Sequence, residues 1–155
     1  MKKIAIGCDQ NAYNLKMILI DFLKEKGYEC DDFGSNEGEE VLYPDVALKV
    51  SEEVSKGNYE RAILLCGTGV GMAITANKVP GVRAAVCHDV YTAERARKSN
   101  NAQVMCMGAL VVGPELAKMM VSAWLESEFQ GGGSTPKVEL MEEIDKRFRG
   151  ENIKE

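Results

Sequence analysis

A chain of 155 residues fits one domain and is long enough to bury a substantial core. Its hydrophobic content of 45% and charged content of 28% are ordinary for a soluble globular protein. The net charge of −5, with no Lys/Arg cluster interleaved with aromatic side chains, argues against a nucleic-acid partner.

Several features of the sequence predict a cytoplasmic protein. Its longest apolar stretches are too short to cross a bilayer, and no signal-peptide pattern precedes the first strand-like segment, so we expect no membrane association. The sequence contains 5 cysteines, an odd number, and no CxxC pair, which indicates reduced thiols. They are Cys8, Cys30, Cys66, Cys87 and Cys106. Metal-ligand spacing is absent and His88 is the only histidine, so we expect no metal site.

Short apolar runs alternate with segments of helical periodicity along the whole chain. The expected strands are 4–8, 28–33, 61–66, 82–87 and 103–107. The expected helices are 15–23, 44–57, 72–78, 92–98, 114–125 and 136–149. Unbroken apolar strands separated by helices indicate a parallel sheet covered on both faces. We therefore expect an α/β fold, a three-layer α/β/α sandwich with a five-stranded parallel Rossmann-like sheet and a C-terminal helix.

Residues 1–155 are expected to form a single domain. One flexible linker is expected, at Gly131-Gly132-Gly133-Ser134, and the helix expected at 136–149 follows it. A helix on a glycine tether can fold back onto its own chain or dock on a partner subunit. The tether is equally well explained as a plain surface loop, and these alternatives stay open.

The most informative local pattern is a cysteine at the end of a buried strand. Cys66 ends the apolar run 62–65 and is followed at once by Gly67-Thr68-Gly69-Val70-Gly71. Such a turn presents backbone N–H groups and a helix N-terminus to the sulfur, and both favour a thiolate or an oxyanion on a bound substrate. A buried structural cysteine ahead of a tight turn explains the same pattern, because free cysteines are commonly buried.

Ligands of open α/β sheets bind beyond the carboxyl ends of the strands. Four polar or glycine-rich segments fall on that edge, namely 8–11, 66–71, 88–89 and the turn at Gly108. Asp9 is there either as a helix N-cap or as a site carboxylate. His88 is either a donor to phosphate or hydroxyl groups or a solvated loop residue. Dinucleotide binding is the weaker interpretation, since Met72 interrupts a G-x-G-x-x-G fingerprint.

Two neighbouring motifs resemble those of the ribose-5-phosphate isomerase B / galactose-6-phosphate isomerase family. They are Cys66-Gly67-Thr68-Gly69-Val70-Gly71 and Ala76-Asn77-Lys78-Val79-Pro80-Gly81-Val82-Arg83-Ala84. Further matches at 7–9, 43–45, 100–102 and 111–117 extend the resemblance over essentially the whole chain. The resemblance implies a cofactor-free aldose–ketose isomerase of the α/β/α sandwich type. It also implies a homodimer or homotetramer whose active sites are shared between subunits.

The resemblance implies a role for each matching residue. Cys66 would be the base that moves a proton between C1 and C2 through a cis-enediolate, and the loop amides would hold the oxyanion, as enediol chemistry requires. The implied catalytic residues are Cys66, Thr68 and Asp9. The expected substrate-binding residues, some of which differ from the family pattern, are Gln10, Tyr43, Gly67, Gly69, Val70, Gly71, Ser99, Asn100 and Lys137.

The sequence departs from the family pattern where phosphate is bound and where the sugar ring is opened. Gln10 replaces a common histidine, Leu110 an arginine, and Gly133 and Lys137 two further arginines. Ser99 stands where many members carry the histidine that helps to open the ring. Because the planar fork of arginine suits phosphate, these changes predict an altered phosphate-binding mode.

Three explanations of these departures are open. The favoured one is a different phosphosugar, gripped by Lys137, Arg97, Lys98 or His88; Ser99 then fits an open-chain substrate such as a tetrose phosphate, which needs no ring opening. The second is a sugar without phosphate. The third is a non-catalytic sugar-binding partner subunit, against which the intact Cys66 loop argues. Sugar chain length, stereochemistry and the choice between dimer and tetramer are not determined by the sequence.

Overall fold

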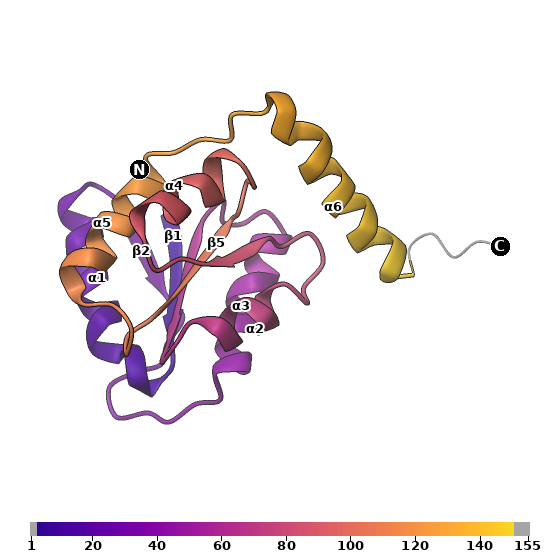
Figure 1. Cartoon of the computed structure of the whole chain (residues 1–155). Helices are drawn as coiled ribbons and strands as arrows, with labels where there is room; N and C mark the ends of the chain where they lie inside the picture. Colours follow the sequence, from indigo (N-terminus) through magenta and orange to yellow (C-terminus); the bar gives the residue numbers. More distant parts are fainter. Residues whose placement is uncertain (1–2, 151–155) are drawn as a thin grey trace.

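The computed structural model describes residues 3–150 and shows three layers, with helices on both faces of a central sheet (Figure 1). The five strands pair in parallel in the order β2-β1-β3-β5-β4. Their bounds are Lys3–Cys8 (β1), Glu29–Asp32 (β2), Ala62–Cys66 (β3), Ala84–Val86 (β4) and Val104–Gly108 (β5). The predicted α/β/α fold class is therefore confirmed.

Within residues 3–150, six helices follow the strands in the order that the apolar periodicity predicts. They are α1 (Tyr13–Glu25), α2 (Tyr43–Ser55), α3 (Val70–Ala76), α4 (Val90–Lys98), α5 (Pro114–Leu125) and α6 (Thr135–Phe148), with 3₁₀ turns at Gln10–Ala12 and Gly132–Ser134. The buried residues of α1, α4 and α5 form one core layer, and those of α2 and α3 form the other. Two predicted strands, 28–33 and 82–87, are longer than β2 and β4, which lie at the sheet edges and pair on one side only.

The central strand β3 is buried along its whole length because β1 and β5 flank it. Alternate side chains of a strand point to opposite faces, so Ile63 and Leu65 pack with the first core layer. Leu64 and Cys66 pack with α2 and α3 in the second. Burial of each large aliphatic side chain contributes roughly 1.5–3 kcal/mol. The strand that carries Cys66 is therefore fixed on both edges and on both faces.

Helix α6 stands apart from the sandwich at the end of an extended segment (Figure 1). Val138 is its one buried residue, whereas Leu140, Met141, Ile144 and Phe148 are exposed. Polar contacts attach the helix: Asp145 accepts the N–H of Gly81 at 2.9 Å, and Glu142 pairs with Arg83. The apolar side expected for this helix is thus uncovered by its own chain. Within residues 3–150, no helix is long and apolar enough to cross a membrane.

Four of the five thiols fill or border the core, as predicted. Cys8, Cys87 and Cys106 are fully buried, whereas Cys30 on the edge strand β2 is partly exposed. Burial raises the pKa of the Cys87 thiol from 9.0 to about 12 and that of Cys30 to about 11. Burial likewise raises the pKa of the Cys8 and Cys106 thiols. These four groups therefore stay protonated at neutral pH.

The raised pKa of Cys87 predicts a loss of stability at high pH. Between its unfolded value of 9.0 and its folded value of about 12, the unfolded chain releases a proton that the folded chain keeps, so the free energy of unfolding falls as pH rises. In Cys87→Ala this fall should be shallower by up to about 1.4 kcal/mol per pH unit. Urea unfolding at pH 8 to 10.5 measures it, and identical slopes for the two proteins would contradict the assignment.

Candidate active site

The loop between β3 and α3 surrounds the sulfur of Cys66. Cys66 is only 4% exposed, and its Sγ accepts a hydrogen bond from the N–H of Gly69 at 3.0 Å. In the sheet, Cys66 lies opposite Gly108 of β5. A backbone N–H directed at sulfur stabilises negative charge on it. The structure therefore places a thiol beneath an amide-rich loop at the carboxyl edge of the sheet, as the sequence predicts.

This loop lies directly on the backbone at the end of β5. A Cβ added to Gly69, whose φ is +77°, would come within 2.8 Å of the Met107 backbone. A Cβ added to Gly108 would come within 2.5 Å of the carbonyl oxygen of Gly67 and of the Cα of Thr68. No side chain fits at either contact, so glycine is required on both sides of it. The position of the thiol thus depends on the position of the β5 terminus.

The predicted site residue Asp9 lies beside this loop, and Thr68 is part of it. The buried Asp9 donates its N–H to the carbonyl of Leu65, the residue before Cys66, at 3.1 Å. Its carboxylate accepts the N–H of Asn11 at 3.0 Å, which confirms the N-cap interpretation and leaves a role towards substrate as a prediction. The hydroxyl of the exposed Thr68 accepts the N–H of Val70 at 3.3 Å.

Tyr43 begins α2 and covers the start of α3. A Cβ added to Gly71 would lie 2.3 Å from the Cζ atom of its ring, so the phenol rests on the glycine backbone. Gln10 borders the same edge, where its Oε1 accepts the N–H of Val41 at 3.1 Å. The predicted residues Asp9, Gln10, Tyr43, Cys66 and 67–71 are therefore brought together in one chain.

A buried lysine, which sequence reasoning did not single out, fixes the loop next to Gln10. Lys16 is fully buried in α1, and its ammonium donates to Asp32 at 2.8 Å and to the carbonyl of Ser35 at 2.6 Å. A buried ammonium is stable only when it is paired in this way. Apart from its position on a helix that reads as amphipathic, nothing in the sequence signals this contact.

The remaining predicted residues lie at the opposite end of the strands, where the strands begin. Helix α4 runs back from the carboxyl edge, so Ser99 and Asn100 follow its last turn near the strand starts. Close by, the carbonyl of Gln103 accepts the N–H of Ala62 at the first residue of β3, at 2.9 Å. The five residues of β3 span roughly 13 Å between this edge and Cys66.

The exposed Lys137 belongs to the same side as Ser99 and Asn100, because the tether before α6 is fixed there. The N–H of Gln130 donates to the carbonyl of Lys98 at the end of α4, at 3.1 Å. One chain therefore does not bring Ser99, Asn100 and Lys137 to the sulfur of Cys66. Sequence spacing could not show this division, since both groups flank the same strands.

Two of the cations expected to grip phosphate are engaged elsewhere. Arg97 is buried and pairs with Glu60 at 2.8 Å, and it also donates to the carbonyl of Ala102. Lys98 pairs with Glu94 one turn earlier in α4, at 3.1 Å. These two residues therefore stabilise the fold and the helix rather than offering a free cation. Within residues 3–150, no group of three His, Cys, Asp or Glu side chains could hold a metal ion.

His88 has a role that neither sequence interpretation foresaw. It is partly buried, and its Nε2 accepts the N–H of Gly108 at 3.0 Å, so the ring carries its proton on Nδ1. Because β4 ends at Val86, this N–H lies beyond the last β4–β5 pair, and the imidazole supplies its acceptor. The solvated-loop interpretation is wrong. His88 holds the β5 terminus on which the Cys66 loop rests.

These features define an α/β/α protein with a thiol beneath a glycine-rich loop at the carboxyl ends of its central strands. A sequence model of the Ribose/Galactose Isomerase family matches residues 4–141, and the chain belongs to this family of isomerases. It is 61% identical to "Ribose-5-P isomerase B" of Listeria innocua, over 95% of this chain and 99% of that protein. It is 56% identical to "D-erythrulose-4-phosphate isomerase" of Pectobacterium atrosepticum, over 90% and 92% of the two chains.

Solved structures agree with this assignment. The structure of Clostridium thermocellum ribose-5-phosphate isomerase B superimposes with a TM-score of 0.91 at 49% identity, covering 94% of this chain and 99% of that one. The type B ribose 5-phosphate isomerase of Trypanosoma brucei gives a TM-score of 0.89 at 37% identity, covering 93% and 99%. The fold that carries the Cys66 loop is therefore that of this isomerase family.

The hydrogen bond from Gly108 to His88 predicts different kcat values for two variants of His88. His88→Leu removes the acceptor, so the β5 terminus and the loop shift and kcat should fall roughly 10- to 100-fold. His88→Gln, whose Oε1 can accept the same N–H, should keep most of the turnover. Thermal unfolding of both variants checks that they fold. Equal kcat for His88→Leu and the unmodified chain would contradict this role.

Proposed function

We propose that the chain is an aldose–ketose isomerase for a small sugar phosphate, with Cys66 as the catalytic base. The observation that carries the proposal is the sulfur of Cys66 at the tip of β3, accepting the N–H of Gly69 at 3.0 Å. In the aldose-to-ketose direction the thiolate removes the proton from C2. The C–H electron pair forms the C1–C2 double bond, and O1 becomes the enediolate oxygen. A proton passes from O2 to O1, and as the C2=O bond forms, the electron pair of the C1–C2 double bond takes the proton back from the thiol at C1, so no external oxidant or reductant is consumed.

The start of α3 supplies donors for the enediolate oxygen. The first helical hydrogen bond runs from the N–H of Ala73 to the carbonyl of Gly69. The N–H groups of Gly71 and Met72 precede it and so have no acceptor within the helix. Removal of one such donor from an oxyanion site typically costs about 10²- to 10³-fold in turnover. In this proposal Asp9 and Thr68 contact the sugar hydroxyls.

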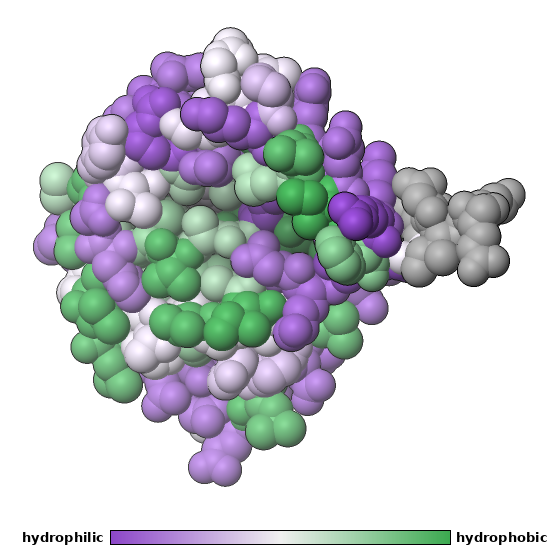
Figure 2. Space-filling view, turned by 45° about the vertical axis from the view of Figure 1, so that its right-hand side comes forward, coloured by the Kyte–Doolittle hydropathy of each residue, from purple (hydrophilic) through white to green (hydrophobic). Residues whose placement is uncertain are grey.

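A second copy of the chain completes the site in this proposal. The residues around Cys66 lie at the carboxyl ends of the strands, whereas Ser99, Asn100 and Lys137 lie on the side where the strands begin. Contact between two chains is the arrangement that unites the two groups. Both regions are apolar at the surface, as an interface requires. Near the Cys66 loop the exposed residues are Leu42, Val70, Ile74 and Leu110, and on α6 they are Leu140, Met141, Ile144 and Phe148. Figure 2 shows apolar patches beside the hollow on the face that α6 borders.

The substrate we favour is an open-chain tetrose phosphate. Ser99 provides no imidazole to open a ring, and a tetrose phosphorylated at its terminal oxygen cannot close one through that oxygen. The relative named D-erythrulose-4-phosphate isomerase is 56% identical, and one so named from Mycolicibacterium smegmatis is 46% identical over 82% of this chain. Ribose 5-phosphate is the second candidate, on the strength of the 61% identical relative named for it.

Two alternatives from the sequence lose support. A non-catalytic partner subunit has no need for a thiol held beneath an intact glycine loop, and the relatives at 61% and 56% identity are both named for phosphorylated sugars. A cytoplasmic location remains part of the proposal. All five cysteines are free, as in a reducing compartment.

Cys66→Ala should abolish catalysis while leaving the fold intact, since no other base replaces the sulfur. We expect kcat to fall at least about 10³-fold and solvent deuterium to stop entering C2 of the sugar phosphate. Proton NMR in D₂O measures both. Cys30→Ala, which removes a partly exposed thiol on the edge strand β2, is the matched control and should exchange like the unmodified chain. Exchange that persists in Cys66→Ala would show that another residue is the base.

Mixed oligomers test the shared site. We call the Cys66 loop one half-site and the region of Ser99, Asn100 and Lys137 the other. Cys66→Ala removes the base from the first half-site, and Asn100→Leu obstructs the second. Each variant alone should therefore be nearly inactive. When the two are co-expressed with different tags, an isolated mixed dimer contains one intact site and should recover about half of the unmodified activity. Absence of mixed oligomers, or mixed dimers no more active than either variant, would contradict a site built from two chains.

A further inference from the structure

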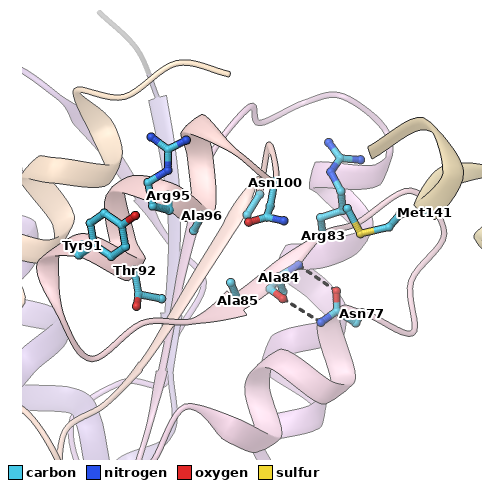
Figure 3. Close-up of a pocket in the computed structure, with 11 residues that line it drawn as sticks. Asn77, Arg83, Ala84, Ala85, Tyr91, Thr92, Arg95, Ala96, Asn100 and Met141 are labelled. Atoms are coloured by element: carbon cyan, nitrogen blue, oxygen red, sulfur yellow. Dashed lines mark hydrogen bonds between the residues drawn. The ribbon is translucent and has the colours of Figure 1, made fainter. Parts of the chain in front are cut away.

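A pocket of about 460 Å³ lies between β4, α4 and α6 (Figure 3). Ala84 and Ala85 of β4 line it with Tyr91 and Arg95 of α4, and Asn100 and Met141 complete much of its wall. The volume is within the range of sites for small molecules. The lining is mainly apolar, and arginine, asparagine and tyrosine side chains add polar groups to it.

Arg95 is the unneutralised cation of this pocket. Its Nε–H donates to the hydroxyl of Ser99 at 2.8 Å, whereas its contact with Gln130 is long, at 3.4 Å, and therefore weak. Among residues 3–150, Arg95 forms no ion pair with a carboxylate. By contrast, Arg83, Arg97 and Arg61 pair with Glu142, Glu60 and Glu128. Figure 3 shows the Arg95 and Arg83 guanidinium groups towards the same rim of the pocket, with Asn100 between them.

The bond to Ser99 gives the guanidinium a defined orientation. When Nε is held by the hydroxyl, the two terminal nitrogens form the outer edge of the fork, where one makes only the long contact with Gln130, and this edge matches two oxygens of a phosphate. Asn100 and Tyr91 add neutral donors in the same pocket. Ser99 is short enough to leave room for the guanidinium beside it, so the serine and the arginine act as a pair. This chemistry selects a phosphate monoester over an uncharged sugar.

We propose that Arg95, oriented by Ser99, binds the phosphate of the substrate. The inference rests on the proposed function, because α4 delivers Arg95 to the same half-site as Asn100. It explains how a chain with Gln10, Leu110 and Gly133 still holds an anion: the cation comes from α4 instead. The residue at position 99 then serves phosphate binding rather than ring opening, which restricts the enzyme to sugars that are already open.

Removal of the guanidinium tests this role. Arg95→Met should raise KM for erythrulose 4-phosphate about 10- to 100-fold and leave kcat within a few-fold, because the phosphate does not react. Arg95→Lys keeps the charge without the planar fork, so its KM should lie between those of Arg95→Met and the unmodified chain. Ser99→Ala should raise KM less, since it loosens the orientation alone. The matched control is Lys98→Met, which removes an ion-paired cation from the same helix and should leave KM unchanged.

Inorganic phosphate supplies a readout that does not depend on turnover. It should raise the melting temperature of the unmodified chain and of Lys98→Met but not that of Arg95→Met. An unchanged KM and an unchanged phosphate shift in Arg95→Met would overturn the inference, and so would equal losses in Lys98→Met. If phosphate stabilises the chain through Arg95 but no sugar phosphate is isomerised, the proposed function fails and the anion site stands. If turnover requires Cys66 but not Arg95, only the anion site fails.

Discussion

The close contact between the 67–71 loop and the end of β5 determines where the sulfur of Cys66 lies. Gly69 lies there against the backbone of Met107, and Gly108 against that of Gly67 and Thr68, at distances that admit no Cβ atom, and the N–H of Gly69 points at Cys66. His88 in turn holds Gly108, because its Nε2 accepts the N–H of Gly108. The position of the Cys66 sulfur therefore depends on the 67–71 loop packing against the end of β5 with no side chain between them. A rigid central strand and a tight turn supply that precision more reliably than a flexible loop would.

Most of the fold could be predicted because its elements obey simple periodicities. The buried strand 61–66 and the amphipathic helix 114–125 were recognisable from apolar runs and from helical spacing, and both occur where expected. The lengths of β2 and β4 were overestimated, because an apolar run does not reveal that a strand lies at a sheet edge. The apolar side of α6 was visible in the sequence, but that it would stay uncovered in one chain was not.

The site was predictable only in part. The Cys66 loop carries its own signal, since a strand, a cysteine and three glycines are contiguous in sequence. Which edge of the sheet holds Ser99 depends on the path of α4, and that requires the folded chain. Whether a cation is free depends on its partners: Arg97 is neutralised by Glu60, whereas Arg95 is bound to a neutral hydroxyl. The acceptor role of His88 likewise arises from two segments 20 residues apart.

We propose that Cys66, alone of the five thiols, is the group that reacts at the site. Inactivation by iodoacetamide at neutral pH, followed by peptide mass mapping, tests it most directly. The account predicts that loss of activity parallels incorporation of one carbamidomethyl group on Cys66, and that a sugar phosphate slows both. Full activity after complete modification of Cys66, or inactivation that tracks a label on a different residue, would contradict it.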